Sequence, residues 1–360
     1  MGKGNWFLSI IEKNKGFLVM IFVQLVYSGM ALFSKAAISK GMNPYVFVAY
    51  RQAFATLTLA PFAFFLDRKK SDPLSYRLIW KIFLASLFGI TLSLNLYTYA
   101  INYVSATFAS ASINTIPALT FLITVVFRIE SFSIRDSPGM LKLAGSVVSL
   151  SGAMVFAFVK GPQVNFMNWH SGTDANQLKT NSVTSKEKWI QGCLLMLLAN
   201  TAWASWLVIQ APLVKQYPAK FRLTMLQCLF SCIQSSVWAM SMKRDISSWK
   251  LKWDLNLFSV AYCGVVTGIS YWLQLWAVER KGPLFVAIFS PLTLIFTAII
   301  SAFLWKEMLY LGSICGGILL VGGLYCVLWG KNKEALKQAN QEQPEPQPQP
   351  PSFAKEETIV

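Results

Sequence analysis

The sequence predicts an all-α membrane protein with ten transmembrane helices arranged as two inverted five-helix repeats. Of its 360 residues, 54% are hydrophobic and only 13% are charged, about half the charged share of an ordinary soluble domain. The hydrophobic residues gather in ten runs, each close to the roughly 20 residues that cross a bilayer as a helix. A polar segment separates the first five runs from the last five.

This pattern divides the chain into five parts. Residues 1–16 form a basic N-terminal segment, and residues 17–159 hold the first five-helix repeat. Residues 160–188 form a polar linker loop before the second repeat, residues 189–330. The last part, residues 331–360, is rich in Gln and Pro, so we expect a disordered tail that buries no core.

The first run follows Lys3, Lys13 and Lys15, an arrangement also found in signal peptides. It is longer than a signal peptide's apolar core and lacks a small-residue cleavage site, so we interpret it as a retained span. Glycine, proline and tryptophan punctuate the later runs, as is typical of packed membrane helices. The expected spans are 17–38, 44–66, 77–99, 104–127, 138–159, 189–209, 220–241, 256–278, 283–304 and 309–329.

The two halves match weakly when the chain is shifted by 177 residues. This register aligns Glu130 with Glu307 and Gly145 with Gly322. Each half has an odd number of spans, so the halves would insert with opposite orientations, as in many secondary transporters. Lys and Arg residues near the span ends are more frequent on one side of the membrane, chiefly in the first half. The side with more basic residues is expected to be cytoplasmic, and both termini lie on that side.

The distribution of reactive side chains argues against an enzyme. All 16 Asp and Glu residues lie in loops, in tails or at span ends, and the only histidine, His170, lies in the polar linker. We therefore expect no catalytic cluster, no metal and no cofactor. The net charge is +16, and the basic residues responsible for it cluster between the apolar runs. In that position they orient membrane helices rather than bind nucleic acid. The six cysteines lie in or beside apolar runs, so we expect no disulfide framework.

The fourth span of each half contains an internal proline. Pro117 lies within the uncharged stretch 107–127, and Pro291 lies within 284–304. Proline cannot donate a backbone hydrogen bond and breaks or kinks a helix. Interrupted spans in corresponding halves are a sequence indication of a transporter's binding site, so we expect both prolines to form gates.

Polar residues recur at helical spacing in several spans. Such stripes either pack helices together or face a shared central cavity, and their number favours the cavity. A single stripe, taken alone, usually indicates helix packing. The substrate-contact candidates outside the charged residues are Gln24, Tyr27, Asn95, Tyr99, Asn114, Trp203, Tyr271, Gln274 and Ser290.

Two basic residues lie in spans or at their edges. Lys35 is close to the end of the first span, where its side chain can extend to the interface. Arg51 lies about two turns into the second span, where it can bind neighbouring carbonyls or a substrate carboxylate. Both alternatives stay open for both residues.

Four longer pieces resemble plant nodulin-like proteins related to "walls are thin" (the UMAMIT set) of the drug/metabolite transporter superfamily, with EamA-type repeats. They are residues 34–64, 107–130, 282–292 and 322–331. The resemblance implies a ten-helix carrier of amino acids or auxin in the plasma membrane or the vacuolar membrane. Its cavity would involve spans one, three, four, six, eight and nine. Gln52 and Ser290 depart from the residues usual in that family, which leaves the substrate open.

These observations predict a facilitative or exporting carrier of amino acids or similar small organic solutes that works by alternating access. The nearest alternative is an exporter of auxin or another metabolite with the same fold. A membrane enzyme or a channel is the alternative of a different class. The expected partners are a small-molecule substrate and the lipid bilayer, while the oligomeric state stays open.

Overall fold

The computed structural model describes residues 3–67, 75–104, 109, 112–129, 137–158, 186–242, 249–251, 254–305 and 311–341. These residues form helices and turns, and no strand occurs among them. Most of the predicted linker, together with the tail beyond Gln341, lies outside the described part of the chain.

Among the residues that the structure describes, the first five predicted spans correspond to eight helical segments. The third span is a continuous rod in which a π-helical turn, η1, joins two α-helices, and in the fourth span a short 3₁₀ turn, η2, directly precedes α6. The segments are α1 (Lys3–Ser39), α2 (Pro44–Phe65), α3 (Tyr76–Ala85), η1 (Ser86–Thr91), α4 (Leu92–Ala100), η2 (Ile113–Thr115), α6 (Ile116–Val126) and α7 (Ser137–Phe158).

The described residues of the second half form six helices, which cover its five predicted spans. The sequence predicts a disordered tail from Lys331, whereas the last helix continues to Gln341. That extension is tied to α7 by an ion pair between Lys142 and Glu334. The segments are α8 (Lys186–Gln216), α9 (Lys220–Met242), α10 (Leu255–Lys281), α11 (Pro283–Ile288), α12 (Ser290–Trp305) and α13 (Leu311–Gln341).

Each of the ten predicted runs overlaps at least one described helix. Seven stretches are long and apolar enough to cross a membrane, and a shorter apolar helix spans Ile113–Val126. The multi-pass, all-helical character is therefore confirmed for the described residues, while ten crossings stays a prediction. The seven stretches are Lys15–Ser39, Tyr76–Ala100, Glu187–Gln216, Lys220–Met242, Leu255–Lys281, Pro283–Ile300 and Ile314–Glu334.

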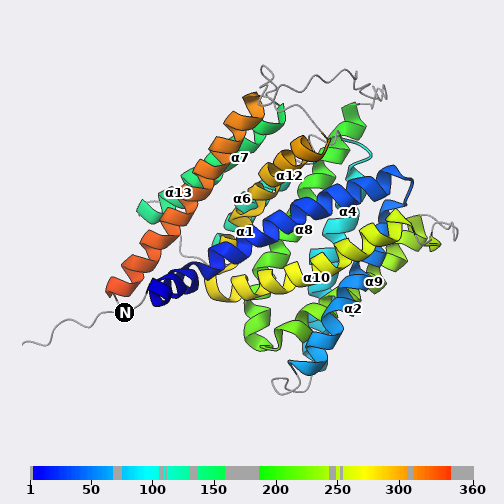
Figure 1. The fold of residues 1–360 in the computed structure, drawn as a ribbon, viewed down its shortest axis with the longest axis horizontal. Helices are drawn as coiled ribbons and strands as arrows, with labels where there is room; N and C mark the ends of the chain where they lie inside the picture. The colour runs from blue at the N-terminus through cyan, green and yellow to red at the C-terminus, as the bar shows by residue number, and fades with distance from the viewer. Residues whose placement is uncertain are drawn as a thin grey trace, which may run out of the picture.

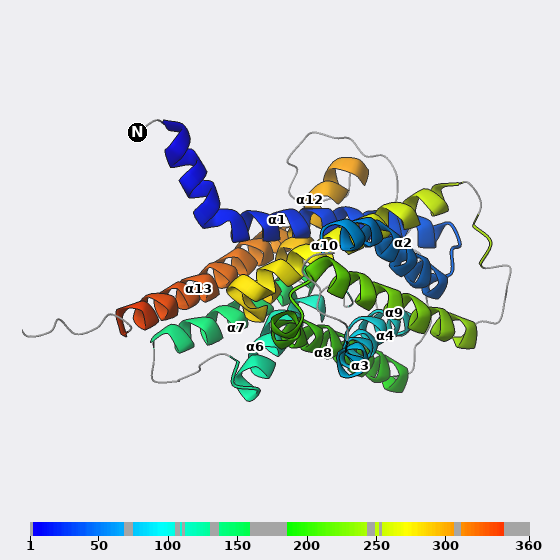
Figure 2. The same ribbon diagram turned by 90° about the horizontal axis from the view of Figure 1, so that it is seen from below.

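Corresponding helices of the two halves have corresponding packing partners. α1 packs on α10 and α12, while α8 packs on α4 and α6. α2 packs against α9, and α7 packs against α13 along one side of the bundle (Figure 1). Figure 2 shows that the first turns of α1 bend away from the rest of that helix.

Glycines allow α7 and α13 to approach closely along an antiparallel contact. A Cβ atom added to Gly145 would lie 2.7 Å from the carbonyl oxygen of Gly323, and one added to Gly152 would lie 3.0 Å from that of Gly316. Further along α13, a Cβ on Gly330 would lie 3.0 Å from the carbonyl oxygen of Pro138. Small residues of this kind provide the packing contacts that hold membrane helices together.

Candidate functional site

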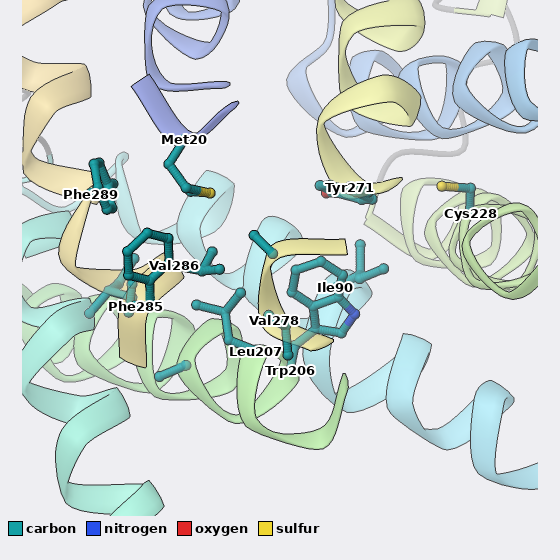
Figure 3. Packing of buried hydrophobic residues seen from close by; sticks show 14 of the residues in the cluster. Met20, Ile90, Trp206, Leu207, Cys228, Tyr271, Val278, Phe285, Val286 and Phe289 are labelled. Carbon is teal, nitrogen blue, oxygen red and sulfur yellow. The ribbon is translucent and has the colours of Figure 1, made fainter. Parts of the chain in front are cut away.

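The largest apolar core joins the two halves. Figure 3 shows residues of this core that come from α1, η1, α8, α9, α10, α11 and the turn before α12. Trp206 and Tyr271 both belong to it, with ring centroids 5.1 Å apart, and the Cys228 sulfur faces Tyr271. Polar side chains that border this core therefore lie between the halves, where a carrier binds its substrate.

A polar group that we call the Arg51 cluster borders the core. Its five members come from three helices: Tyr27 from α1, Arg51 and Gln52 from α2, and Tyr271 and Gln274 from α10. The Gln274 Nε2 atom donates a 2.5 Å hydrogen bond to the Tyr27 hydroxyl. The charge of Arg51 interacts electrostatically with Tyr27 and Tyr271, and Gln52 lies beside the Tyr271 hydroxyl.

Two glycines of α10 set the position of Arg51. A Cβ atom added to Gly264 would lie 2.9 Å from the Arg51 carbonyl oxygen and 2.2 Å from the Phe54 Cβ atom. A Cβ atom added to Gly268 would lie 3.0 Å from the Ala55 carbonyl oxygen. The spacing of four residues puts both glycines on one face of α10, so the α2 backbone can lie directly against it.

Arg51 is a buried cation that makes no ion pair with any described carboxylate. Only 8% of the residue is exposed, and its Nε atom is buried without a hydrogen-bond partner in the described chain. A charge at the centre of a membrane helix costs about 2.5–3.5 kcal/mol on insertion scales. Such a group is maintained where it serves a substrate or ion pathway.

Aromatic rings cover one side of the cluster. The ring centroid of Trp203 lies 5.0 Å from that of Trp206 and 5.8 Å from that of Tyr271. Trp206 is buried, whereas Trp203 is only partly buried. Of the predicted contacts, the structure therefore brings Tyr27, Arg51, Trp203, Tyr271 and Gln274 together.

The two proline-containing spans are interrupted at matching places. Pro117 is the second residue of α6 and follows the turn η2, while Pro291 is the second residue of α12 and follows the break at Phe289. Asn114 is buried within η2, and Ser290 is the first, partly buried residue of α12. Proline is well suited to the first turn of a helix, where no backbone donor is needed. The interruption thus falls immediately before each proline.

Hydrogen bonds from the opposite half hold both interrupted spans. Gln24 of α1 accepts a 2.5 Å hydrogen bond from the Thr293 hydroxyl in α12. Asn200 of α8 donates to the Ser112 carbonyl oxygen over 2.7 Å and to the Thr115 hydroxyl over 3.2 Å. Gln24, predicted to contact substrate, is therefore bonded to an interrupted helix in this structure.

The remaining predicted contacts lie elsewhere. The Asn95 Nδ2 atom bonds to the Thr91 carbonyl oxygen over 2.8 Å and to the Ser235 hydroxyl over 3.2 Å, so it joins α4 to α9. Tyr99 accepts a 2.8 Å hydrogen bond from the Tyr103 hydroxyl. Lys35 is exposed on α1, as expected for a side chain that extends to the interface.

Gln52 is the member of the Arg51 cluster that sequence reasoning assigned no role. The search for stripes used spacings of three and four residues, and Gln52 directly follows Arg51. A polar residue next to an intramembrane charge was the available signal. No group of three or more potential metal ligands occurs among the residues described.

Comparison with known proteins places the chain in a family. The profile of the EamA-like transporter family matches residues 14–158 and again residues 190–329. WAT1-related protein At1g43650 of Arabidopsis thaliana is 54% identical over 326 residues, which cover 90% of this chain and 94% of that protein. WAT1-related protein At5g64700 of the same plant is 45% identical, with 90% and 92% covered.

A solved crystal structure has a related fold. It superposes with a TM-score of 0.66 and covers 88% of this chain and 99% of its own. Its sequence is 13% identical, so the likeness concerns the fold alone. The two family matches and the close plant relatives confirm the resemblance read from the sequence. The chain therefore belongs to the EamA-like transporter family, which indicates a multi-pass membrane transporter rather than an enzyme.

Proposed function

We propose that this chain is an alternating-access carrier that moves amino acids or similar small organic solutes, by facilitated diffusion or export. The observation that carries the proposal is Arg51, a buried cation without a carboxylate partner among the described residues. A guanidinium binds a carboxylate through two parallel hydrogen bonds. The substrate carboxylate would thus supply the anion that this part of the protein lacks.

The rest of the substrate would lie between Trp203, Trp206 and Tyr271 on one side and the Tyr27–Gln274 pair on the other. Aromatic faces bind apolar groups and attract cations. The phenol and amide oxygens can accept hydrogen bonds from an ammonium group. This arrangement suits a small solute with one charged end.

Alternating access would arise from movement of one inverted repeat against the other. Its support is the matched packing of the two halves, in which α1 and α8 each contact the interrupted span of the opposite repeat. The α7–α13 contact is also symmetric when the two helices are exchanged. The Gly145–Gly323 pair lies at its middle, with Gly152–Gly316 on one side and Pro138–Gly330 on the other. The breaks before Pro117 and Pro291 would then serve as gates.

For orientation, we propose that both termini face the cytoplasm, with the plasma membrane as the site of action. Lys15 of α1 and Arg280 of α10 lie 5.9 Å and 4.8 Å from the centroid of the Trp276 ring. Lys331 of α13 donates a 3.0 Å hydrogen bond to the carbonyl oxygen of Lys281. Three helices thus bring basic residues to one end of the bundle, which is the expected cytoplasmic end.

Flux into proteoliposomes tests the function. Purified protein would be reconstituted and offered a panel of labelled amino acids and indole-3-acetate, with and without a pH gradient. The proposal predicts saturable uptake of at least one amino acid and its loss in Arg51→Gln. Uptake that never saturates would indicate a channel, and an unchanged rate in Arg51→Gln would remove Arg51 from the site.

An auxin-like organic acid is the second candidate. Among the described residues no acidic side chain forms an ion pair within the Arg51 cluster, so a substrate ammonium group would gain only neutral acceptors. A net anion with an aromatic body would be balanced by Arg51 and packed by Trp203 and Trp206. Preferred uptake of indole-3-acetate over every amino acid in the same panel would support this candidate.

A further inference from the structure

Gln52 has an environment that the carboxylate site alone leaves unexplained. The residue is fully buried, and among the residues described neither Nε2 nor Oε1 of its side chain has a hydrogen-bond partner. An unsatisfied buried polar group lowers the stability of the protein, so two on one side chain are rare in a folded core. Gln210, a comparably buried amide, exchanges hydrogen bonds with Gln227.

The unsatisfied amide of Gln52 belongs to the residue next to Arg51, which is proposed to bind the carboxylate. Arg51 and Gln52 are consecutive residues of α2, and both are buried because α9 and α10 each pack against this helix. Arg51 contributes a second buried donor without a partner, its Nε atom. The Gln52 side chain also lies close to the Tyr271 hydroxyl, near the limit of hydrogen-bonding distance but without hydrogen-bond geometry, and Tyr271 in turn interacts with Arg51. Both residues with unsatisfied polar atoms, Arg51 and Gln52, are therefore neighbours of Tyr271.

We propose that Arg51 and Gln52 form a headgroup subsite for a carboxylate whose adjacent carbon carries a hydrogen-bond donor, as in α-amino and α-hydroxy acids. The inference rests on the proposed function and specifies its substrate class. The Arg51 Nε atom and the Gln52 Nε2 atom donate to the carboxylate, and the Gln52 Oε1 atom accepts from the α-substituent. A site built to bind such a group rejects analogues that lack it, because its own polar atoms then stay unpaired.

Two matched ligand series isolate the α-substituent. One series is L-alanine, L-lactate and propionate, and the other is L-phenylalanine, L-3-phenyllactate and 3-phenylpropionate. Within each series the side chain is constant while the substituent changes from ammonium to hydroxyl to hydrogen. Equilibrium binding to the purified full-length protein would be measured for the wild type, for Gln52→Met and for Gln234→Met. Gln234 is the matched control, because its amide bonds to Thr91 in a different contact.

We expect the wild type to bind the hydroxy and amino acids roughly threefold to tenfold more tightly than the plain acid, the worth of one hydrogen bond. Gln52→Met should remove this preference and, because it also loses the Nε2 donor to the carboxylate, weaken binding of all three acids by a further roughly threefold to tenfold. Gln234→Met should keep both the preference and the affinity. If Gln52→Met cannot be purified, Gln52→Asn replaces it with the same expectation. Equal binding of the three acids by the wild type, or a preference that survives in the Gln52 variant, would overturn the subsite. No binding in either series would instead contradict the proposed carboxylate function.

Discussion

A guanidinium inside a membrane protein needs an anion, hydrogen-bond acceptors or water to offset its lost hydration. Arg51 has no described carboxylate partner and contains a buried donor without a hydrogen bond. A purely structural arginine would be expected to bind the carbonyl oxygens of neighbouring helices. The proposed function therefore implies that Arg51 destabilises the empty protein and is stabilised when substrate binds.

The first prediction separates function from structure at this residue. Arg51→Met keeps a long side chain and removes the charge, so it should raise the free energy of unfolding of the empty protein by about 1–3 kcal/mol and abolish transport. The measurement is the thermal midpoint in detergent together with flux in proteoliposomes. A large fall in the midpoint would instead identify Arg51 as a structural residue.

Sequence reasoning named several members of the Arg51 cluster for physical reasons. Arg51 was visible as a charge within a span, and Tyr27, Tyr271 and Gln274 were visible as polar residues at helical spacing. Asn95 has the same appearance in the sequence, yet it bonds to Thr91 and to Ser235 of α9. Single-helix periodicity cannot distinguish these cases, because the identity of the neighbouring helix decides them.

Among the elements, the interrupted spans are the parts best suited to move. Their breaks were expected from Pro117 and Pro291, and the structure places each proline in the first turn after a break. The π-helical turn Ser86–Thr91 was not expected, since no sequence feature marked it. It brings the Ser86 hydroxyl to within 2.7 Å of the Gln227 carbonyl oxygen, so tertiary contacts stabilise it.

The second prediction concerns the amides that hold the interrupted spans. Gln24→Leu removes the acceptor for Thr293, and Asn200→Leu removes the donor to Ser112 and Thr115. Each hydrogen bond contributes about 0.5–1.5 kcal/mol, so each variant should change turnover several-fold while substrate affinity stays within about threefold. Affinity is measured by equilibrium binding and turnover by flux. A loss of affinity in Gln24→Leu without a change in turnover would assign Gln24 to substrate contact.

At the scale of the whole molecule, the two halves meet through contacts that correspond in pairs. The family profile matches each half separately, and the packing partners of α1 correspond to those of α8. The identity between the halves was too low to establish this from the sequence. The number of spans and the coinciding glycines nevertheless predicted the repeat, because hydropathy sets span length and small residues set close helix contacts.

The third prediction tests the α7–α13 contact with adjacent glycines. A Cβ atom on Gly323 would lie 2.5 Å from the Ser149 backbone nitrogen, whereas a Cβ atom on Gly322 would meet nothing within 4 Å. Gly323→Ala should therefore lower the unfolding free energy by about 1–3 kcal/mol, while Gly322→Ala should change it by less than about 0.5 kcal/mol. Thermal unfolding of the two purified variants provides the comparison. Equal stability of both would show that α7 and α13 are not packed this closely.

The central claim is that a carboxylate solute binds at Arg51 and crosses as the two halves alternate. Counterflow in proteoliposomes tests it most directly: vesicles loaded with unlabelled substrate are diluted into a trace of the labelled compound. We predict transient accumulation of label in wild-type vesicles and none in Arg51→Gln vesicles with the same protein content. Label that only equilibrates in wild-type vesicles, or that accumulates equally with Arg51→Gln, would contradict the account.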